Sequence, residues 1–294
     1  MPNLYSIDVR SSPSQHLSTG EIKAVIYHDC FDCPLSFSEM IRWRSTDSAN
    51  IKTDHEIAVR NRYCFLKGRD GLIFKKMLRQ RISDKKMEIA KNASKVLSFV
   101  PGVKMVAVTG SLAMENSDDE SDIDLMIVTK AGSLWTTRLL SYFSLFAFRF
   151  SLRSPNDKNQ KDKLCLNMWL DENDLVWRER NIYTAHEIAQ IVPLVNKDKT
   201  YEKFLYKNRW ILNYWPNSVK IRNPKSQIRN KSEFSKFKYL NIVSNFVLRT
   251  SNLIAFKIQY LYMKPKISRE LVTKTRALFH PQDWGRVIIA RIVV

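Results

Sequence analysis

Cysteine is scarce in this sequence, which has four in 294 residues: Cys30, Cys33, Cys64 and Cys165. Cys30 and Cys33 form a lone Cys-x-x-Cys motif. Structural zinc would need two further ligands at matching spacing, and neither Cys64 nor His55 is suitably placed. The sequence therefore favours free thiols over a zinc or redox site, as is usual in a reducing compartment.

The sequence also lacks a leader and an uninterrupted hydrophobic run long enough for a bilayer. The first 20 residues are polar, without the apolar segment of a signal peptide. The stretch from Leu134 to Phe150 is too short. The charged residues Arg249 and Lys257 interrupt the longer stretch from Tyr239 to Met263. We therefore expect a cytoplasmic protein without a membrane span.

Acidic residues are scarce in the last third of the chain. Residues 201–294 contain 19 Lys and Arg but only four Asp and Glu, which gives +15 of the formal net charge of +19. A surface of this kind suits polyphosphate, nucleic acid or an anionic membrane. A solvated helical surface explains it equally well. Nucleic acid is thus a candidate partner of this region.

Two short apolar runs carry the strongest functional signal. The run from Val103 to Val108 ends in Gly110-Ser111, and after ten further residues Asp122-Ile123-Asp124 opens a second run that ends at Val128. Both runs are short and β-branched, as in buried strands. Side chains alternate along a strand, so Asp122 and Asp124 share one face. Two neighbouring carboxylates repel each other unless a cation lies between them. Mg²⁺ (or Mn²⁺) is the cation that we expect there.

Gly110 and Ser111 supply features of a phosphate-binding turn. Glycine at the end of a strand lets the backbone turn tightly and approach a ligand. Ser111 begins a predicted helix, where a hydroxyl and free backbone amides can hold a phosphate oxygen. The segment therefore predicts a phosphate cradle next to a metal-binding pair.

These residues resemble the signature of the DNA polymerase β-like nucleotidyltransferase superfamily. In that family an apolar strand is followed by Gly-Ser, here Gly110-Ser111, and after a spacer by Asp-x-Asp, here Asp122-Ile123-Asp124. The resemblance implies an α/β (α+β) fold with a mixed sheet flanked by helices, and two magnesium ions. It also implies transfer of a nucleoside monophosphate from a nucleoside triphosphate to a hydroxyl, with release of pyrophosphate. The alternative is an acidic turn that joins two ordinary strands.

The family has a third carboxylate on a later strand, and the sequence departs from the pattern there. The best later strand is 164–171, where Asn167 occupies the central polar position. An amide oxygen can bind a metal but cannot act as a base. Asp171 lies four residues further on, about 13 Å along a strand. Either Asp171 serves as the third catalytic carboxylate, or the site works with two, or the enzyme is impaired.

The region before the core predicts two helices and a hairpin in residues 18–70, after a loose tail in residues 1–17. Capping boxes at Ser18–Glu21 and Ser36–Glu39 open the helices, and a hairpin turns around Asn61-Arg62. This order resembles a winged-helix unit whose recognition helix would lie in residues 46–56. We expect this unit to pack against a neighbour more readily than to bind DNA.

The remaining chain divides into the core, residues 71–180, and a basic helical region, residues 181–294. A linking helix is predicted over 71–99, with one buried stripe that includes Phe74, Met77 and Leu78. In the last region a capping box at Thr184–Glu187 opens a helix that Pro193 ends. Further helices are predicted over 199–214, 234–263 and 267–277, with a basic linker over 216–232.

The sequence thus predicts a metal-dependent nucleotidyltransferase that uses a nucleoside triphosphate and a hydroxyl acceptor that no motif identifies. Asp122 and Asp124 are the candidate metal ligands, and Gly110 and Ser111 the candidate nucleotide-binding residues. The alternative is an impaired nucleotide- or nucleic-acid-binding regulatory protein, or an antitoxin-like partner, on the same fold. Asn167 is the feature that favours this alternative.

Overall fold

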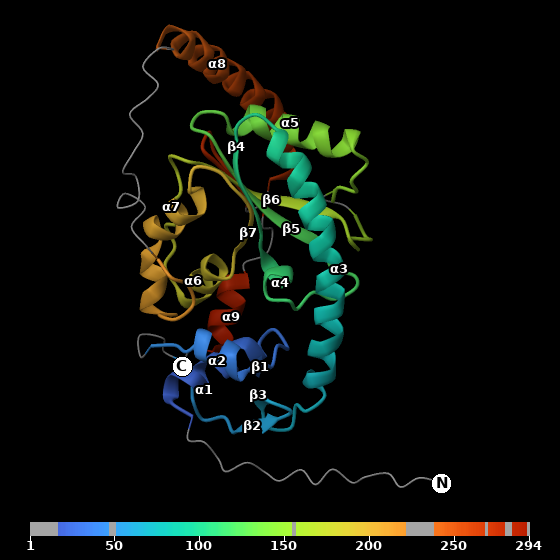
Figure 1. Cartoon of the computed structure of the whole chain (residues 1–294), viewed down its shortest axis with the longest axis vertical. Helices are drawn as coiled ribbons and strands as arrows, with labels where there is room; N and C mark the ends of the chain where they lie inside the picture. Colours follow the sequence, from blue (N-terminus) through green and yellow to red (C-terminus); the bar gives the residue numbers. More distant parts are fainter. Residues whose placement is uncertain are drawn as a thin grey trace.

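The computed structural model describes residues 17–46, 51–154, 157–221, 238–267, 270–279 and 284–292, with the backbone alone for residues 238–249 and 266. The expected tail and most of the basic linker lie outside these residues. The fold is mixed α/β, with a small amino-terminal unit below a central sheet and a long helix along one side (Figure 1).

The amino-terminal unit has the predicted local structure. Helix α1 (Thr19–Asp29) and helix α2 (Phe37–Arg42) begin with capping boxes in which Ser18 and Ser36 are the N-caps. Strands β2 (Ile57–Arg60) and β3 (Tyr63–Leu66) pair as an antiparallel hairpin, and β1 (Leu35–Ser36) adds to β3. Asn61 and Arg62 both adopt positive φ angles, 51° and 66°, as a two-residue hairpin turn requires.

The expected recognition helix is not present in residues 51–56, where Ile51 forms an isolated bridge and no helix is found. Residues 47–50 lie outside the described residues. The unit instead packs against the last third of the chain. Thr46 and Ser45 bond to the backbone at Asn213 and Tyr214, and Arg42 donates to the carbonyl of Ser218. The unit therefore packs within the chain.

Helix α3 (Leu72–Phe99) occupies the predicted linking segment, but its first turns bury a different stripe. Phe74, Met77 and Leu78 are exposed, whereas Lys76 and Lys86 are buried. Each buried lysine has partners: Lys76 Nζ bonds to Glu39 (2.9 Å), and Lys86 Nζ bonds to Asp162 (2.8 Å). The prediction failed here because ion pairing makes burial of a lysine tolerable.

The central sheet has six strands in the order β7-β4-β5-β6-β9-β8. Strand β4 (Val103–Val108) pairs antiparallel with β5 (Ile123–Thr129), and β5 pairs parallel with β6 (Leu164–Asp171). The short helix α4 (Gly110–Ala113) follows β4, and α5 (Leu134–Ala147) follows β5. Parallel pairing of β5 and β6 places the starts of both strands at the same edge of the sheet.

The last region, residues 181–294, is not purely helical as predicted. Strand β7 (Val192–Asn196) pairs with β4, β9 (Arg276–Leu278) pairs with β6, and β8 (Leu271–Val272) pairs with β9. The expected helix over 267–277 is therefore wrong. Pro193 lies in β7, at the edge of the sheet, where proline is tolerated. Tertiary pairing outweighs weak local preference at such short segments.

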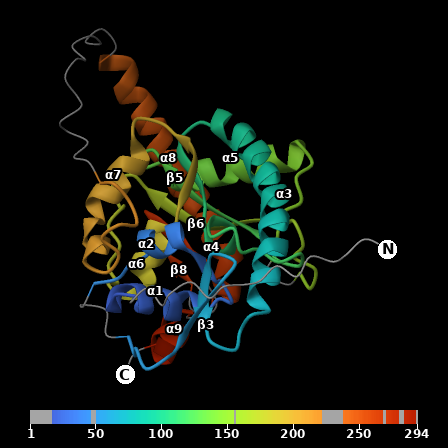
Figure 2. The same cartoon turned by 60° about the horizontal axis from the view of Figure 1, so that its bottom comes forward.

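Helices cover both faces of the sheet. On one face, α3, α5 and α8 (Lys238–Met263) pack against residues such as Val106, Ile127 and Trp169. On the other, α6 (Ile182–Ala189), α7 (Thr200–Lys207), the 3-10 helix η1 (Arg209–Asn213) and α9 (Trp284–Ile292) pack near Met126 and Met168. Helix α9 lies beside α6 and close to α1 in both views (Figures 1 and 2). A further 3-10 turn, η3 (Lys264–Lys266), follows α8.

A buried side chain from α8 holds the start of α5. Asn252 Oδ1 accepts hydrogen bonds from the backbone N–H groups of Trp135 (2.7 Å) and Thr136 (3.2 Å). Ser133, the N-cap of α5, makes no capping bond with its own side chain. The amides that a helix start leaves unpaired are therefore satisfied by a residue more than a hundred positions later.

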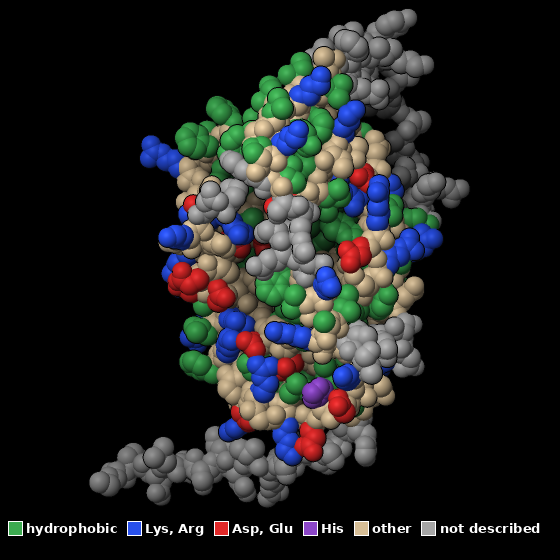
Figure 3. Space-filling model, turned by 180° about the vertical axis from the view of Figure 1, so that it is seen from behind, with side chains coloured by type: hydrophobic (Ala, Val, Ile, Leu, Met, Phe, Trp, Pro, Cys, Tyr) green, Lys and Arg blue, Asp and Glu red, His purple; other side chains and the backbone are tan. Residues whose placement is uncertain are grey.

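No helix within the described ranges is long and apolar enough to cross a bilayer. Seen from behind, Lys and Arg side chains lie among Asp and Glu over most of the surface (Figure 3). At the end of the molecule that carries α8, basic and hydrophobic side chains lie next to each other (Figure 3). All four cysteines are free thiols.

Candidate functional site

The predicted phosphate turn lies directly against the predicted carboxylate pair. Gly110 begins α4 with a positive φ of 62°. A Cβ atom at Gly110 would lie 2.6 Å from Asp124 Oδ2, which is closer than non-bonded atoms approach. Thr109 N–H also donates to the carbonyl of Asp124 (3.1 Å). Glycine is therefore required both by the backbone conformation and by the proximity of the carboxylate.

Asp122, Asp124 and Cys165 gather at the starts of β5 and β6. Asp124 and Cys165 are register partners in the parallel pair. One ligand atom from each of the three side chains lies within 4.8 Å of the others. Asp122 Oδ2 also accepts a hydrogen bond from Arg153 Nη1 at 2.5 Å. The two predicted metal ligands are thus brought together, and an arginine neutralises one of them.

Burial and mutual repulsion perturb the carboxylate pair. Burial raises the pKa of Asp124 from 3.8 to about 7, and the charge of Asp122 adds to this effect. Burial and the two carboxylates also raise the pKa of the Cys165 thiol. Cys165 is therefore a neutral thiol at neutral pH. Asp124 is partly protonated near pH 7 when no cation is bound.

A β-bulge decides what surrounds Asp124 on β6. Asp124 pairs with Cys165 and Met126 with Met168, so β6 has one more residue than β5 between these two pairs. The bulge brings Asn167 to the carboxylate, and Asn167 Nδ2 donates to Asp124 Oδ1 at 2.6 Å. The carbonyl oxygen Asn167 Oδ1 is buried without a partner. A buried, unpaired oxygen is costly.

The donor set fits a hard divalent cation. Asp122 and Asp124 offer carboxylate oxygens, and Mg²⁺ prefers oxygen ligands. A protonated thiol at Cys165 contributes little to binding Mg²⁺, because thiolates suit softer metals. The residues therefore fit magnesium better than zinc.

The structure does not bring Asp171 to this site. Asp171 pairs with Thr129 at the far end of β6, five residues beyond Asp124 along β5, or roughly 17 Å. Its carboxylate accepts hydrogen bonds from the backbone of Gly132 (2.6 Å) and Asn173 (2.9 Å). Because of the bulge, Asp171 lies on the opposite face of the sheet from Asp124. Asp171 therefore stabilises the turns that contain Gly132 and Asn173.

The spacer between Ser111 and Asp122 is fixed to α3. Ser117 N–H donates to Ser83 Oγ (3.1 Å), and the hydroxyls of Ser111 and Ser117 lie 3.2 Å apart. Buried Lys86 donates to the carbonyl of Ser121 at 2.7 Å. These bonds attach the loop to α3 at Ser117 and at Ser121, on either side of the acidic residues 118–120. They explain why α3 buries a lysine and a serine.

Glu187 is a carboxyl group that the sequence analysis named only as a capping residue. It lies on α6, and burial together with the charge of Asp124 raises its pKa to about 8. The predicted capping box is wrong, because α6 begins at Ile182 and Asn181 Oδ1 accepts from Thr184 N–H at 2.7 Å. Glu187 Oε1 accepts a hydrogen bond from Gln190 Nε2 at 2.8 Å, and the side chain lines a cavity together with Met126 and Met168 of the sheet.

His186, next to Glu187, points away from the site into the amino-terminal unit. Its Nε2 lies 3.1 Å from Nε2 of His28, and both rings are buried. Burial lowers the pKa of His28 to about 4 and lowers that of His186 well below its ordinary value. The pair is a structural contact between α1 and α6.

Comparisons of this chain with protein-family models, with curated proteins and with solved structures found no match.

Proposed function

We propose that this protein is a magnesium-dependent nucleotidyltransferase with a polymerase β-like core. In this proposal it transfers a nucleoside monophosphate from a nucleoside triphosphate to a hydroxyl group and releases pyrophosphate. The observation that carries the proposal is the contact between Gly110 and Asp124. It joins a glycine–serine turn at the end of one strand to a carboxylate pair on the next strand.

Each residue has a role in this proposal. Asp122 and Asp124 would hold the cation, and Gly110 and Ser111 would hold phosphate oxygens at the start of α4. Bound magnesium neutralises the triphosphate charge, which supplies much of the catalysis of phosphoryl transfer. Manganese has the same ligand preferences.

The proton of the acceptor hydroxyl needs a base, and Asn167 cannot supply one. Glu187 is the candidate for this role because it lines a cavity with Met126, two residues beyond Asp124, and its pKa of about 8 is close to neutral. Asp171 is not suited, since it lies at the other end of the sheet.

The test measures thermal stability with each nucleoside triphosphate, with and without Mg²⁺, for the wild type, Asp122→Asn and Asp124→Asn. Ligand that binds the native state raises the melting temperature. We expect a magnesium-dependent rise that both variants lose. Release of pyrophosphate with a pool of cell-extract acceptors should be lost in the same variants. Equal shifts in all three proteins would refute the proposal.

The second candidate is a nucleotide-binding regulatory protein without transfer activity. The observation that favours it is that Asn167, an amide, bonds to Asp124 where the family has a carboxylate. Binding of nucleotide without release of pyrophosphate from any acceptor pool would support this alternative.

A further inference from the structure

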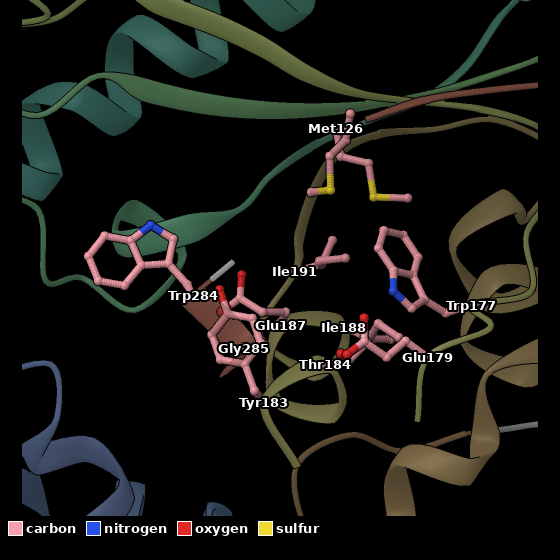
Figure 4. A pocket seen from close by; sticks show the side chains of 11 residues that line it. Met126, Trp177, Glu179, Tyr183, Thr184, Glu187, Ile188, Ile191, Trp284 and Gly285 are labelled. Atoms are coloured by element: carbon pink, nitrogen blue, oxygen red, sulfur yellow. The ribbon is translucent and has the colours of Figure 1, made fainter. Parts of the chain in front are cut away.

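A cavity of about 150 Å³ lies between the central sheet and α6. Met126 and Met168 form its wall on the sheet, and Tyr183, Thr184, Glu187 and Ile188 form its wall on α6 (Figure 4). Met126 is two residues beyond Asp124 on the same strand face, about 7 Å away. The cavity therefore adjoins the site at which the proposed transfer takes place.

The size of the cavity limits what it can hold. An apolar cavity of about 150 Å³ is large enough for one benzene ring. Trp177, Tyr183 and Trp284 present aromatic side chains to it (Figure 4). Glu179 and Trp284 are exposed and lie at the mouth, whereas Glu187 is half-buried inside. The cavity thus suits one ring-sized group with a polar end.

The charge of the lining is opposite to that of the protein. Glu179 and Glu187 line the cavity, and no Lys or Arg is among its described lining residues, although the chain carries a net charge of +19. The Glu179 carboxylate together with aromatic faces attracts cations, through charge-assisted hydrogen bonds and cation–π contacts. Glu187, whose pKa burial raises to about 8, offers a mostly neutral carboxyl group at neutral pH. The same lining repels the phosphates of nucleic acid.

We propose that this cavity binds the acceptor of the transfer reaction, and that the acceptor is a small hydroxyl compound with a ring-sized body and a cationic amine. In this arrangement the amine lies near Glu179 at the mouth, and the hydroxyl lies near Glu187 and Asp124. The acceptor role rests on the proposed function, whereas binding of an amine to the cavity does not depend on transfer.

The test uses three probes that share one phenol ring and differ in charge: tyramine (cationic), tyrosol (neutral) and 4-hydroxyphenylacetate (anionic). Calorimetric binding is measured without nucleotide. We expect tyramine to bind the wild type roughly tenfold more tightly than tyrosol, because a charge-assisted contact is about twice as strong as a neutral one. The anion should bind most weakly.

Matched variants assign the preference to the cavity. Glu179→Gln should abolish the preference for tyramine, whereas Glu187→Gln should change the affinity for all three probes alike, because the hydroxyl that they share lies near Glu187. Glu88→Gln, the same change on an exposed residue of α3, should leave the preference unchanged. Equal affinity for the three probes, absence of binding, or an unaltered preference in Glu179→Gln would overturn the proposal.

Failure of the amine site can be distinguished from failure of the proposed transferase function. Asp124→Asn should lose the magnesium-dependent nucleotide shift but retain the preference for tyramine. If no nucleotide binds and tyramine still does, the cavity is an amine site without transfer chemistry. Competition between tyramine and nucleotide would instead assign the cavity to the nucleobase and refute the acceptor role.

Discussion

Replacing Asp124 with asparagine should make the metal-free protein more stable at alkaline pH. Asp124 is held beside Asp122 with a pKa of about 7, raised first by burial. The unfolded chain loses this proton near pH 4, so the folded state binds more protons between these two values. Stability therefore falls as pH rises from about 4 to 7 and stays reduced above that range. Asparagine carries no charge, and its Oδ1 can still accept from Asn167.

The size of the effect follows from the pKa difference. A pKa of about 7 instead of 3.8 lowers the free energy of unfolding at high pH by at most about 4 kcal/mol, at 1.36 kcal/mol per pH unit. The carboxylate is partly exposed and its surroundings relax, so we expect a gain of about 2 kcal/mol. For a domain of this size that is roughly 4–8 °C in the melting temperature.

The assay is thermal unfolding followed by circular dichroism, in the presence of a chelator, at about pH 8 and about pH 4.5. Asp124→Asn should be more stable than the wild type at the higher pH and nearly equal at the lower. Asp122→Asn is the matched control. It should give no gain, because it removes the partner of Arg153. The reasoning is refuted if Asp124→Asn is less stable at the higher pH, or gains equally at both.

Three further substitutions or conditions test other parts of the structure. Gly110→Ala should lower stability by about 1–2 kcal/mol and remove the nucleotide-dependent shift, whereas Gly71→Ala, with no neighbour within 4 Å, should do neither in the same thermal assay. Asn252→Ala should cost about 1–2 kcal/mol in chemical denaturation because α5 loses its cap, whereas Asn252→Asp retains an acceptor and should cost less. The pKa of His28, lowered by burial to about 4, means that stability should fall as pH drops from about 6.5 through 4. In His28→Gln this slope of stability against pH should be smaller, and an unchanged slope would show that the buried pair of His28 and His186 does not cause it.

Local chemistry was enough to predict many elements from the sequence. The capping boxes at Ser18 and Ser36 and the turn at Asn61-Arg62 act through neighbours in the chain, and the structure has all three. The two strands that flank Gly110 and Asp122 were evident from their apolar, β-branched runs. Alternation along one strand then placed Asp122 and Asp124 on the same side without any tertiary information.

Long-range contacts decided what the sequence could not. Strands β7, β8 and β9 are short, and they become strands only by pairing with β4 and β6. The bulge in β6 depends on its register with β5. A shift of one residue reverses the side on which every later side chain lies. This shift brings Asn167 to Asp124 and takes Asp171 away.

The candidate metal pair was therefore fixed by the sequence, and its surroundings by the tertiary structure. Asp122, Asp124 and Gly110 lie within one hairpin-like segment, so strand periodicity and glycine geometry determine their proximity. Glu187 and Arg153 come from distant elements, and their positions follow from how α6 and the loop before β6 pack against the sheet. Packing of this kind depends on the whole core, because each contact is set by residues far apart in the chain.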